Sequence, residues 1–563
     1  MISRPILFAS FASLATIAGA QDAPRQHKAQ PTTVAITPAD LRTRLYIIAD
    51  DSMEGRQAGK NGNYRATSYI AREFKRLGLT PAGDSGTFFQ TIPYVQRLAS
   101  SWSRLVINGA PLDLWTDYAL MGTNPLAPAT MFETERTEAV YGGRMGDSSI
   151  VIAPDKVEGK LVVLAPVVGP SGTPIAQLNA ATLAEFQGAA AIAVAYLDAV
   201  PPAVVANLKL PRTVTPMDTS LHGPMLIAIT NKTAERLIGG PFDKVKPAEL
   251  GNSIRARVAY EFKPTEAPAR NVIAILKGSD PKLAGQYVAV GAHNDHIGMM
   301  PAPVDHDSLR AFNRVMRPQG ANDRPGAPTA EQWTQIHAGL DSLRKKNPPR
   351  LDSIANGADD DGSGTAVLLE IAEWFAKTRP HPKRSIIFVS HTGEEAGLLG
   401  SQHFTDHPTV ARDSIVAQLN MDMVGRGRAE DVKAGGPTSI QMIGSRRLST
   451  QLGDIIDSLN THPTAARQQM EIDYSFDAAG HPLNRYCRSD HYMYARYGIP
   501  ITYFSLGYHI DYHMVSDEVQ YIDFDHSARV GNLVKDVALT VANRPERIVV
   551  DKPKPDPKGG CRQ

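Results

Sequence analysis

The sequence of 563 residues has few cysteines and almost no net charge. Its two cysteines, Cys487 and Cys561, cannot build a disulfide framework or a zinc site of four thiolates. The 59 lysines and arginines exceed the 58 aspartates and glutamates by one. This balance argues against nucleic acid or an anionic membrane as the main partner, because both require a concentrated cationic surface. With 42% apolar and 21% charged residues, the chain can bury a large core and is expected to be globular.

Beyond the first twenty residues, no apolar run reaches the length of about 18 residues that a membrane-spanning helix requires. Those first residues carry one basic side chain, Arg4, then an apolar run over 6–17 and three small residues over 18–20. This pattern predicts a secretory signal peptide over 1–20 that is cleaved after Ala20. We therefore expect the mature chain to be exported without a membrane span, to the periplasm or outside the cell.

Two changes of pattern along the chain predict its domains. Residues 21–99 contain two helix-like segments around a loop and form the N-terminal part of the main domain. Short β-like runs fill 100–263, which hold none of the metal-type residues described below, so we expect a β-rich, non-catalytic inserted domain there. Strand-like and helix-like runs alternate over 264–546, and this alternation predicts an α/β sheet covered by helices on both faces.

The C-terminal tail, residues 547–563, is rich in proline and lysine and is predicted to be disordered. Cys561 lies in this tail without an obvious partner. Cys561 is therefore expected to be unpaired, and a disulfide with Cys487 is the less favoured alternative.

Five clusters of acidic or histidine residues follow strand-like runs or open helices. They are GAHNDH over 291–296, GADDDGSG over 357–364, HTGEE over 391–395, NMD over 420–422 and DYH over 511–513. Each cluster alone is typical of a helix cap or a solvated turn. Together they are predicted to meet at the carboxyl ends of the strands, where α/β sheets bind ligands. Imidazole and carboxylate without thiolate suit zinc, and two zinc ions that share a carboxylate would form a hydrolytic pair.

The ordered motifs GAHNDH, GADDDGSG, TGEEAGLLGS, NMDMVGR and YHMVSD resemble the co-catalytic di-zinc aminopeptidase family of clan MH, the secreted bacterial leucine-aminopeptidase type. The loop DSMEGRQAG from Asp51 and the segment NVIAILKGSDP from Asn271 resemble the longer members of that family. The segment VEGKLVV from Val157 and the glycine–alanine run after Gln187 resemble its protease-associated (PA) domain. The resemblance implies a mixed, mostly parallel sheet flanked by helices, an inserted PA-like domain and peptide substrates.

The same resemblance implies two Zn²⁺ ions per chain and a set of five ligands. Asp360 would bridge both ions, His293 and Asp422 would complete the first site, and Glu395 and His513 would complete the second. In the family, the bridging aspartate precedes a cis peptide bond that does not involve proline. We therefore expect one between Asp360 and the next residue.

Three further residues receive roles by resemblance. Glu394 would be the general base, because adjacent side chains of an extended segment point to different sides and only one of Glu394 and Glu395 can bind metal. It would take a proton from the zinc-bridging water and return it to the leaving amine. Asp295 would orient a ligand imidazole, and Tyr512 would donate to the oxyanion or else be a packed aromatic residue.

Other histidines in these clusters receive no ligand role. His296 is expected to support its loop rather than to bind metal. His391 is expected either to support a metal ligand or to be structural, because no second histidine completes a known zinc spacing with it. The pair Asp490 and His491 also recurs in the family, near the substrate pocket, and receives no catalytic role. The sequence contains no G-x-S-x-G motif, which disfavours a serine hydrolase.

The chain departs from the family by an insert over 300–354, between the first histidine motif and the bridging aspartate. The insert is polar, contains one predicted helix near 331–345 and is long for a loop without function. We expect it to form a rim or lid that limits substrate size. Deleting it without any change in the preferred peptide length would contradict this hypothesis.

The function expected is the removal of N-terminal residues from peptides, and three alternatives remain. A glutamate-releasing carboxypeptidase shares the metals but needs an arginine-rich pocket, to which Arg310, Arg314 and Arg317 could contribute. A glutaminyl cyclase shares the fold with one zinc ion. A non-catalytic, receptor-like relative would have lost ligands or the base, and all of these are present here.

Overall fold

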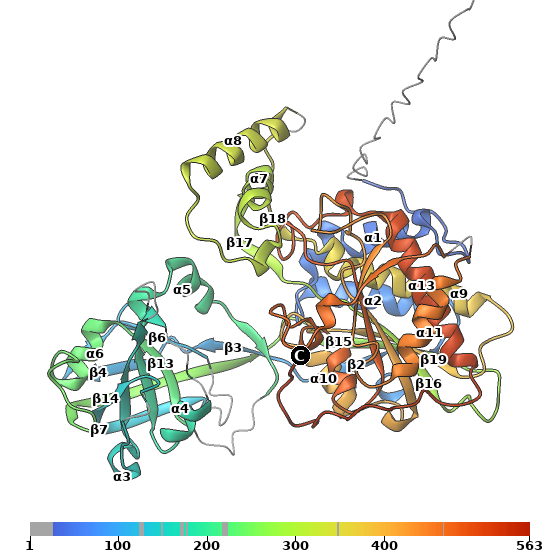
Figure 1. Ribbon diagram of the computed structural model, residues 1–563. Coiled ribbons are helices and arrows are strands. Elements are labelled where there is room, and N and C mark those ends of the chain that lie inside the picture. Colours follow the sequence, from blue (N-terminus) through green and yellow to red (C-terminus); the bar gives the residue numbers. More distant parts are fainter. Residues whose placement is uncertain are drawn as a thin grey trace, which may run out of the picture. The chain divides into compact units, whose positions relative to one another are not determined.

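The computed structural model describes residues 26–122, 129–147, 150–168, 174–175, 178, 180–216, 223–345, 348–464 and 467–563. The predicted signal peptide, 1–20, lies outside the described residues. The chain divides into two compact units (Figure 1). Unit 1 consists of Met1–Thr91 and Arg270–Gln563, and unit 2 of Ile92–Ala269. In the part of the chain that the structure describes, no helix is long and apolar enough to cross a membrane.

Unit 1 is built on a mixed sheet with the strand order β1-β15-β19-β16-β20-β23-β21-β22, in which β2 also pairs with β15. Four adjacent strands at the centre of the sheet run parallel to one another: β19 (Ser385–His391), β16 (Tyr287–His293), β20 (Ile415–Met421) and β23 (Ile501–Ser505). The other strands are β1 (Thr80–Pro81), β2 (Phe89–Ile92), β15 (Ala269–Leu276), β21 (Ser439–Ile443) and β22 (Glu471–Asp473). β15 and β21 run antiparallel to their neighbours β19 and β23. The predicted α/β fold with a mixed, mostly parallel sheet is confirmed.

Helices cover both faces of this sheet. On β19, Ile386 and Phe388 belong to one apolar cluster, whereas Ile387 and Val389 belong to another. The first cluster contains residues of α1 (Pro38–Ile48), α2 (Asn61–Arg76), α9 (Gly364–Lys377), α11 (Thr450–Thr461) and α13 (Phe524–Asn543). The second contains residues of α10 (Leu399–Asp406) and α12 (His491–Ala495). Because strand side chains alternate between faces, the continuous apolar runs of the sequence are explained by burial on both sides.

Local sequence signals start several of these helices. Thr37 precedes α1, and its side chain accepts a hydrogen bond from the backbone N–H of Asp40. Pro38 occupies the first turn, where its missing N–H costs nothing. Asp523 caps α13 in the same way by accepting from the N–H of His526.

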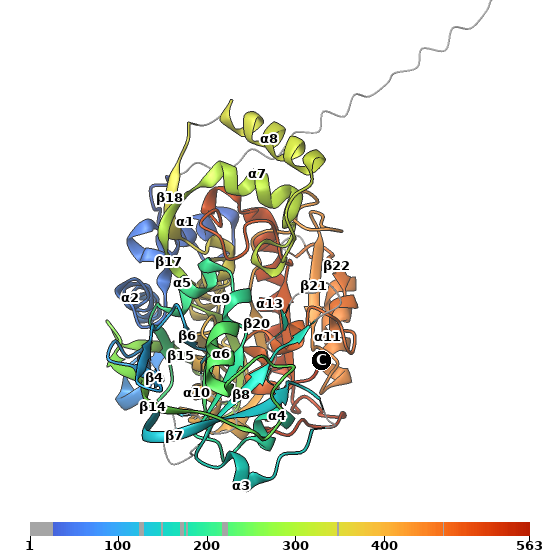
Figure 2. The same ribbon diagram turned by 90° about the vertical axis from the view of Figure 1, so that its left-hand side faces the viewer.

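Unit 2 contains a second sheet with the order β12-β3-β14-β7-β8-β11-β13-β6, in which β4 pairs with β14 and β5. Figure 2 labels its strands β4, β6, β7, β8 and β14. Its longest strands are β7 (Met131–Arg144) and β14 (Leu250–Pro264). The other strands of this sheet are β3 (Val95–Ala99), β4 (Arg104–Ile107), β5 (Ala110–Leu112), β6 (Tyr118–Leu120), β8 (Leu161–Ala165), β11 (Ala191–Ala195), β12 (Arg212–Val214) and β13 (Met225–Ile229). β9 (Val167–Val168) and β10 (Pro174–Ile175) form a separate pair.

The helices of unit 2 are α3 (Pro154–Val157), α4 (Ala180–Glu185), α5 (Pro202–Leu208) and α6 (Asn231–Ile238). The unit is wider than the predicted insertion over 100–263. The reason is that β3 pairs with β14, which ties residues 95–99 to the β-rich sheet. Its likeness to a PA domain stays a prediction.

The insert of unit 1 forms a small substructure of its own. β17 (Gly298–Asp305) pairs antiparallel with β18 (Leu351–Ala355), so that the insert leaves and rejoins the domain at one place. Between them lie α7 (His306–Met316), a short 3₁₀ turn η4 (Gly320–Asn322) and α8 (Ala330–Arg344), and α7 and α8 lie together in both views (Figures 1 and 2). α8 was predicted, and α7 was not, because its buried face includes polar residues rather than an apolar stripe alone.

The tail corrects the sequence-based expectation of disorder. Cys561 forms a disulfide with Cys487, with the two Cα atoms 5.7 Å apart. At the end of the chain, the backbone oxygen of Gln563 accepts from Gly480 N at 2.9 Å, and its side-chain oxygen accepts from Tyr486 N at 3.0 Å. These long-range contacts fix the position of the tail, so the prediction of disorder is wrong and the less favoured alternative, pairing of Cys561 with Cys487, is the one observed.

Candidate metal centre

The predicted site residues lie at one edge of the unit 1 sheet. β16 ends at His293, β19 ends shortly before Glu394, and β20 ends immediately before Asp422. Asp360 lies in the turn η5 (Ala358–Ser363), which leads into α9, and His513 follows β23. Because β16, β19, β20 and β23 are parallel, their carboxyl ends share this edge, as the sequence predicted.

Three of the predicted ligands form a first group of buried donor atoms. The Nε2 atom of His293 lies 3.2 Å from Oδ1 of Asp360 and 3.7 Å from Oδ1 of Asp422. One potential ligand atom from each residue lies within 4.8 Å of the others, close enough for one metal ion.

A second group forms around the other oxygen of Asp360. The Nε2 atom of His513 lies 3.0 Å from Oδ2 of Asp360 and 2.9 Å from Oε2 of Glu395. His296 also belongs to this group, since its Nδ1 atom lies 2.8 Å from Oε1 of Glu395 and 3.6 Å from Oδ2 of Asp360. Asp360 therefore faces one group with each of its carboxylate oxygens.

The donor set fits divalent cations such as zinc. Three buried polar atoms in the two groups make no hydrogen bond of suitable geometry with the described residues, although Nε2 of His293 and Oδ2 of Asp360 have other ligand atoms 3.2 and 3.0 Å away. They are Nε2 of His293, Nε2 of His296 and Oδ2 of Asp360. Burial lowers the pKa of His513, but the carboxylates of Glu395 and Asp360 outweigh this effect and raise it to about 10. The site thus carries an excess of negative charge that a bound cation would balance, with nitrogen and oxygen ligands of the kind that zinc accepts.

The three consecutive aspartates of the second motif have different surroundings. The expected cis peptide bond between Asp360 and Asp361 is present. Asp361 accepts hydrogen bonds from the backbone N–H groups of His293 at 2.9 Å and Gly364 at 3.0 Å, so it joins the end of β16 to the start of α9. Asp359 accepts from Gly425 N at 2.6 Å. Only Asp360 belongs to both candidate metal groups.

Asp295 lies between His293 and the two glutamates. Its carboxylate accepts hydrogen bonds from the backbone N–H groups of Glu394 at 3.1 Å and Glu395 at 3.4 Å. The Nδ1 atom of His293 lies 3.1 Å from the backbone oxygen of Asp295 and 3.6 Å from its carboxylate. Burial raises the pKa of Glu394 well above its usual range, which His293 counteracts and Glu395 reinforces.

Tyr512 packs directly on the second group. Its ring stacks on the ring of His513 with centroids 4.0 Å apart and contacts the ring of Tyr508 at 4.5 Å. Its hydroxyl oxygen accepts a hydrogen bond of 3.4 Å from the guanidinium of Arg488. Tyr512, Tyr508 and Met423 form a small apolar cluster beside the ligands, with Leu483 packed against it.

The structure adds one residue that the sequence interpretation passed over. Arg56 is fully buried, and its guanidinium donates to the backbone oxygens of Asn294 at 3.0 Å, Asn356 at 2.5 Å and Gly357 at 2.8 Å. It therefore ties the loop after β16 to the segment before Asp360. The only available signal was its place in the loop DSMEGRQAG.

Among the other histidines, His391 is buried, and its Nε2 atom lies 3.1 Å from the hydroxyl of Tyr494. This agrees with the structural role expected for it. His296, expected to support its loop, donates its backbone N–H to the oxygen of Arg56 at 3.2 Å and also lies within the second group of potential ligands.

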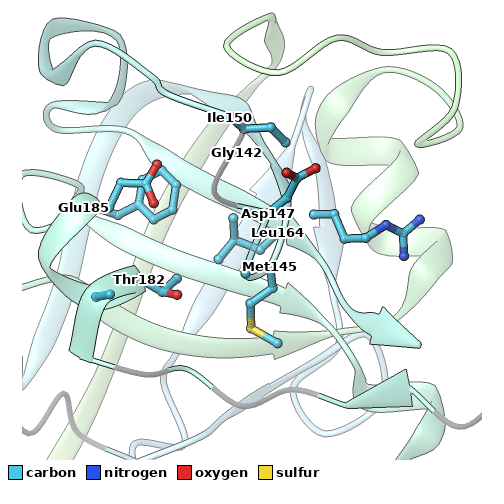
Figure 3. A pocket seen from close by; sticks show the side chains of 11 residues that line it. Gly142, Met145, Asp147, Ile150, Leu164, Thr182 and Glu185 are labelled. Carbon is cyan, nitrogen blue, oxygen red and sulfur yellow. The ribbon is translucent and has the colours of Figure 1, made fainter. Parts of the chain in front are cut away.

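Unit 2 offers a pocket of different chemistry, with a volume of about 180 Å³ (Figure 3). Its labelled lining includes Met145, Asp147, Thr182 and Glu185. Its described lining residues include no histidine or cysteine, so the ligand set found in unit 1 is not repeated there.

Comparison with known proteins identifies the region that holds most of these residues. Residues 324–538 match the family model described as peptidase family M28. This region is M28-like. The resemblance to zinc aminopeptidases that the five motifs predicted is thereby confirmed, and the M28-like region contains every predicted ligand except His293, which precedes it.

Curated relatives cover parts of the chain. Leucine aminopeptidase 1 of Ajellomyces capsulatus is 33% identical over 203 residues, which cover 34% of this chain and 48% of that protein. A protein of Pyrenophora tritici-repentis named "Probable zinc metalloprotease" is 44% identical over 88 residues, 16% of this chain and 20% of that protein. The chain thus spans about half or less of these relatives. Among solved structures, the aminopeptidase from Aneurinibacillus sp. strain AM-1 is 17% identical, with a TM-score of 0.49, over 92% of this chain and 97% of that chain.

Proposed function

We propose that the protein is an exported di-zinc aminopeptidase that removes N-terminal residues from peptides. The observation that carries the proposal is the position of Asp360, whose two carboxylate oxygens face two groups of potential ligands, the first buried and the second partly buried. Zinc held by these groups would polarise a peptide carbonyl and lower the pKa of water, which is the chemistry of peptide hydrolysis by paired metals.

The chain's own residues divide into holders and proton carriers. His293 and Asp422 would hold one ion and Glu395 and His513 the other, with Asp360 shared between them. The Nδ1 atom of His296 lies 2.8 Å from Oε1 of Glu395. His296 would either orient that carboxylate or bind the second metal ion as an additional ligand. The backbone N–H groups of Glu394 and Glu395 both donate to the buried carboxylate of Asp295. These hydrogen bonds fix the backbone of the two glutamates, which supports different roles for their side chains.

Glu394 would act as the general base. It would accept a proton from the attacking water and donate it to the leaving amine, a role that its elevated pKa favours in the second step. Asp295 would hold the backbone of Glu394 and orient the imidazole of His293. Tyr512 would stabilise the oxyanion through its hydroxyl, whose hydrogen bond from Arg488 makes it a better donor.

The surroundings of the ligands support an amino-terminal rather than a carboxyl-terminal specificity. Of the insert's arginines, Arg310 forms an ion pair with Asp511, Arg314 is exposed, and Arg317 lies over the ring of Phe312. They do not form the arginine-rich pocket that a glutamate carboxypeptidase would need. The apolar cluster of Met423, Tyr508 and Tyr512 favours an uncharged N-terminal side chain.

The disulfide between Cys487 and Cys561 supports export. Such bonds persist in oxidising compartments and are rare in the cytosol. This agrees with the predicted signal peptide over 1–20. We further propose that unit 2 is a non-catalytic, PA-like domain, since the pocket described there has carboxylates but no histidine among its described lining residues.

The test is hydrolysis of aminoacyl anilides, free peptides and N-blocked peptides, with and without a chelator. Wild type should release only residues with a free amino group, and the chelator should abolish this release. Glu394→Ala should lose it by about 10²-fold or more, whereas Asp413→Ala should not, because Asp413 is exposed and precedes β20 at the opposite end of the strand. Activity that requires a free carboxylate, cyclisation of N-terminal glutamine, or no activity would instead favour the carboxypeptidase, the cyclase or the receptor-like relative.

A further inference from the structure

The insert between β17 and β18 contacts the backbone segment that carries His513. Asn313 on α7 donates a hydrogen bond from its side-chain amide to the backbone oxygen of Ile510 at 2.8 Å. Ala321 in η4 donates from its backbone N–H to the oxygen of Tyr512 at 3.0 Å. Both bonds go to main-chain atoms, so they fix the path of this segment.

A buried ion pair joins the same two parts. Asp511 is fully buried, and the Nε atom of Arg310 on α7 lies 3.1 and 3.2 Å from its two carboxylate oxygens. Arg426 supplies a second guanidinium at 2.6 Å, and Ser516 donates a hydrogen bond of 2.6 Å. A buried carboxylate must be compensated by opposite charge and hydrogen bonds. The position of Asp511 therefore depends on these three partners, of which Arg310 belongs to the insert.

The backbone at His513 needs such support. Its φ angle is 56°, in the left-handed region that residues other than glycine rarely adopt and that surrounding contacts must maintain. Its neighbour Tyr512 is held at the carbonyl by Ala321. A side chain at Gly320, itself at φ 56°, would place a Cβ atom 2.5 Å from the oxygen of Tyr512 and 2.8 Å from its nitrogen. The insert therefore approaches this segment as closely as glycine allows.

A third link reaches the side chain of Tyr512. Asn322, at the end of η4, accepts a hydrogen bond of 2.8 Å from Arg488, which in turn donates to the hydroxyl of Tyr512 at 3.4 Å. Tyr512 is thus connected to the insert at both its carbonyl and its hydroxyl. Its ring lies against the imidazole of His513.

We propose that the insert is a brace that positions His513 and Tyr512 at the metal centre, with Arg310 as a positioning residue. This inference rests on the proposed function, since it assigns a task to residues given a role there. It differs from the lid expected from the sequence. A lid would affect which peptides enter, whereas a brace affects how tightly the second metal ion is held.

The experiment measures zinc release from the full-length, zinc-loaded protein into an excess of a chromogenic chelator. Arg310→Met removes the ion pair, and Arg314→Met is its matched control, an exposed arginine one turn further along α7. Gly320→Ala forces η4 away from Tyr512, and Gly326→Ala is its matched control, because a Cβ atom there would meet nothing within 4 Å. Circular dichroism establishes that each variant is folded.

Arg310→Met and Gly320→Ala should each release one of the two zinc ions about tenfold faster than wild type, the effect typical of residues that orient ligands. The two controls should behave as wild type. Release of both ions at the wild-type rate from folded Arg310→Met and Gly320→Ala overturns the brace. If Arg310→Met fails to fold, Gly320→Ala decides alone. A wild type that binds no zinc would overturn the proposed function itself, and with it the brace, which is a distinct result.

Discussion

The disulfide that anchors the tail gives a stability prediction that can be worked from the structure. It joins Cys487 to Cys561 across 74 residues of sequence. In the chain-entropy description, closing a loop of this length lowers the entropy of the unfolded chain and stabilises the folded state by about 4.4 kcal/mol at 25 °C. We expect Cys561→Ser to lower the free energy of unfolding of unit 1 by about 2 to 4 kcal/mol, since measured values commonly fall below this limit.

The assay is urea unfolding followed by tryptophan fluorescence, with wild type measured both oxidised and after reduction of the disulfide. Reduced wild type should unfold at the same urea concentration as Cys561→Ser, because both have lost only the crosslink. Hydrolytic activity at low urea should be largely retained in the variant. A decrease smaller than about 1 kcal/mol, or a reduced wild type as stable as the oxidised one, would refute the assignment of this stability to loop closure.

Three further predictions concern charge, protonation and metal. Arg44 is buried and forms ion pairs of 2.5 to 2.6 Å with Glu73, Glu370 and Glu373. Arg44→Met removes this cation from the three carboxylates, so it should lower the free energy of unfolding of unit 1 in urea by about 3–5 kcal/mol. A change below about 1 kcal/mol would contradict the argument. Burial lowers the pKa of His491 to about 3, so the folded state stays neutral while the unfolded state gains a proton below pH 6.5, and stability falls as the pH decreases from about 6.5 to 3. His491→Phe should therefore reduce the loss of stability between pH 7 and 4.5 by about 2.5 kcal/mol, and an unchanged loss would show that another group titrates. Removing zinc with a chelator should lower the urea midpoint for unfolding of unit 1. Zinc at 100 times its dissociation constant stabilises the folded state by about 2.7 kcal/mol per site. An unchanged midpoint would contradict metal binding.

The sequence predicted the sheet, and it predicted that the candidate site residues meet at one edge of it, because both expectations follow from local patterns along the strands. Apolar runs over 287–292, 385–390 and 415–421 predicted three strands, which the structure has over 287–293, 385–391 and 415–421, and the polar residues after each run marked their carboxyl ends. Parallel neighbours place those ends at one edge, so residues far apart in sequence could be predicted to meet. Two helices around a loop were also predicted over 38–79, the second from the spacing of its apolar residues and from Gly78 after it, and the structure has Pro38–Ile48 and Asn61–Arg76 there.

The features that escaped prediction depend on contacts between distant segments. The tail has no local signal for structure, and only its pairing with Cys487 and the bonds of Gln563 fix it. α7 lacked a clear apolar stripe because Arg310 and Asn313 face polar partners near His513 rather than the core. The burial of Arg56 could not be anticipated from an arginine in a polar loop, since its acceptors are backbone oxygens contributed by other segments.

The measurement that tests the central claim most directly is the number of zinc ions bound by wild type and by Asp360→Ala after equilibrium with buffered zinc. Asp360 faces both ligand groups, so the account predicts two ions per chain for wild type and fewer than one for Asp360→Ala. Asp413→Ala, an exposed carboxylate away from the site, should bind two. Two ions in Asp360→Ala, or at most one in wild type, would contradict a metal pair built on a shared carboxylate.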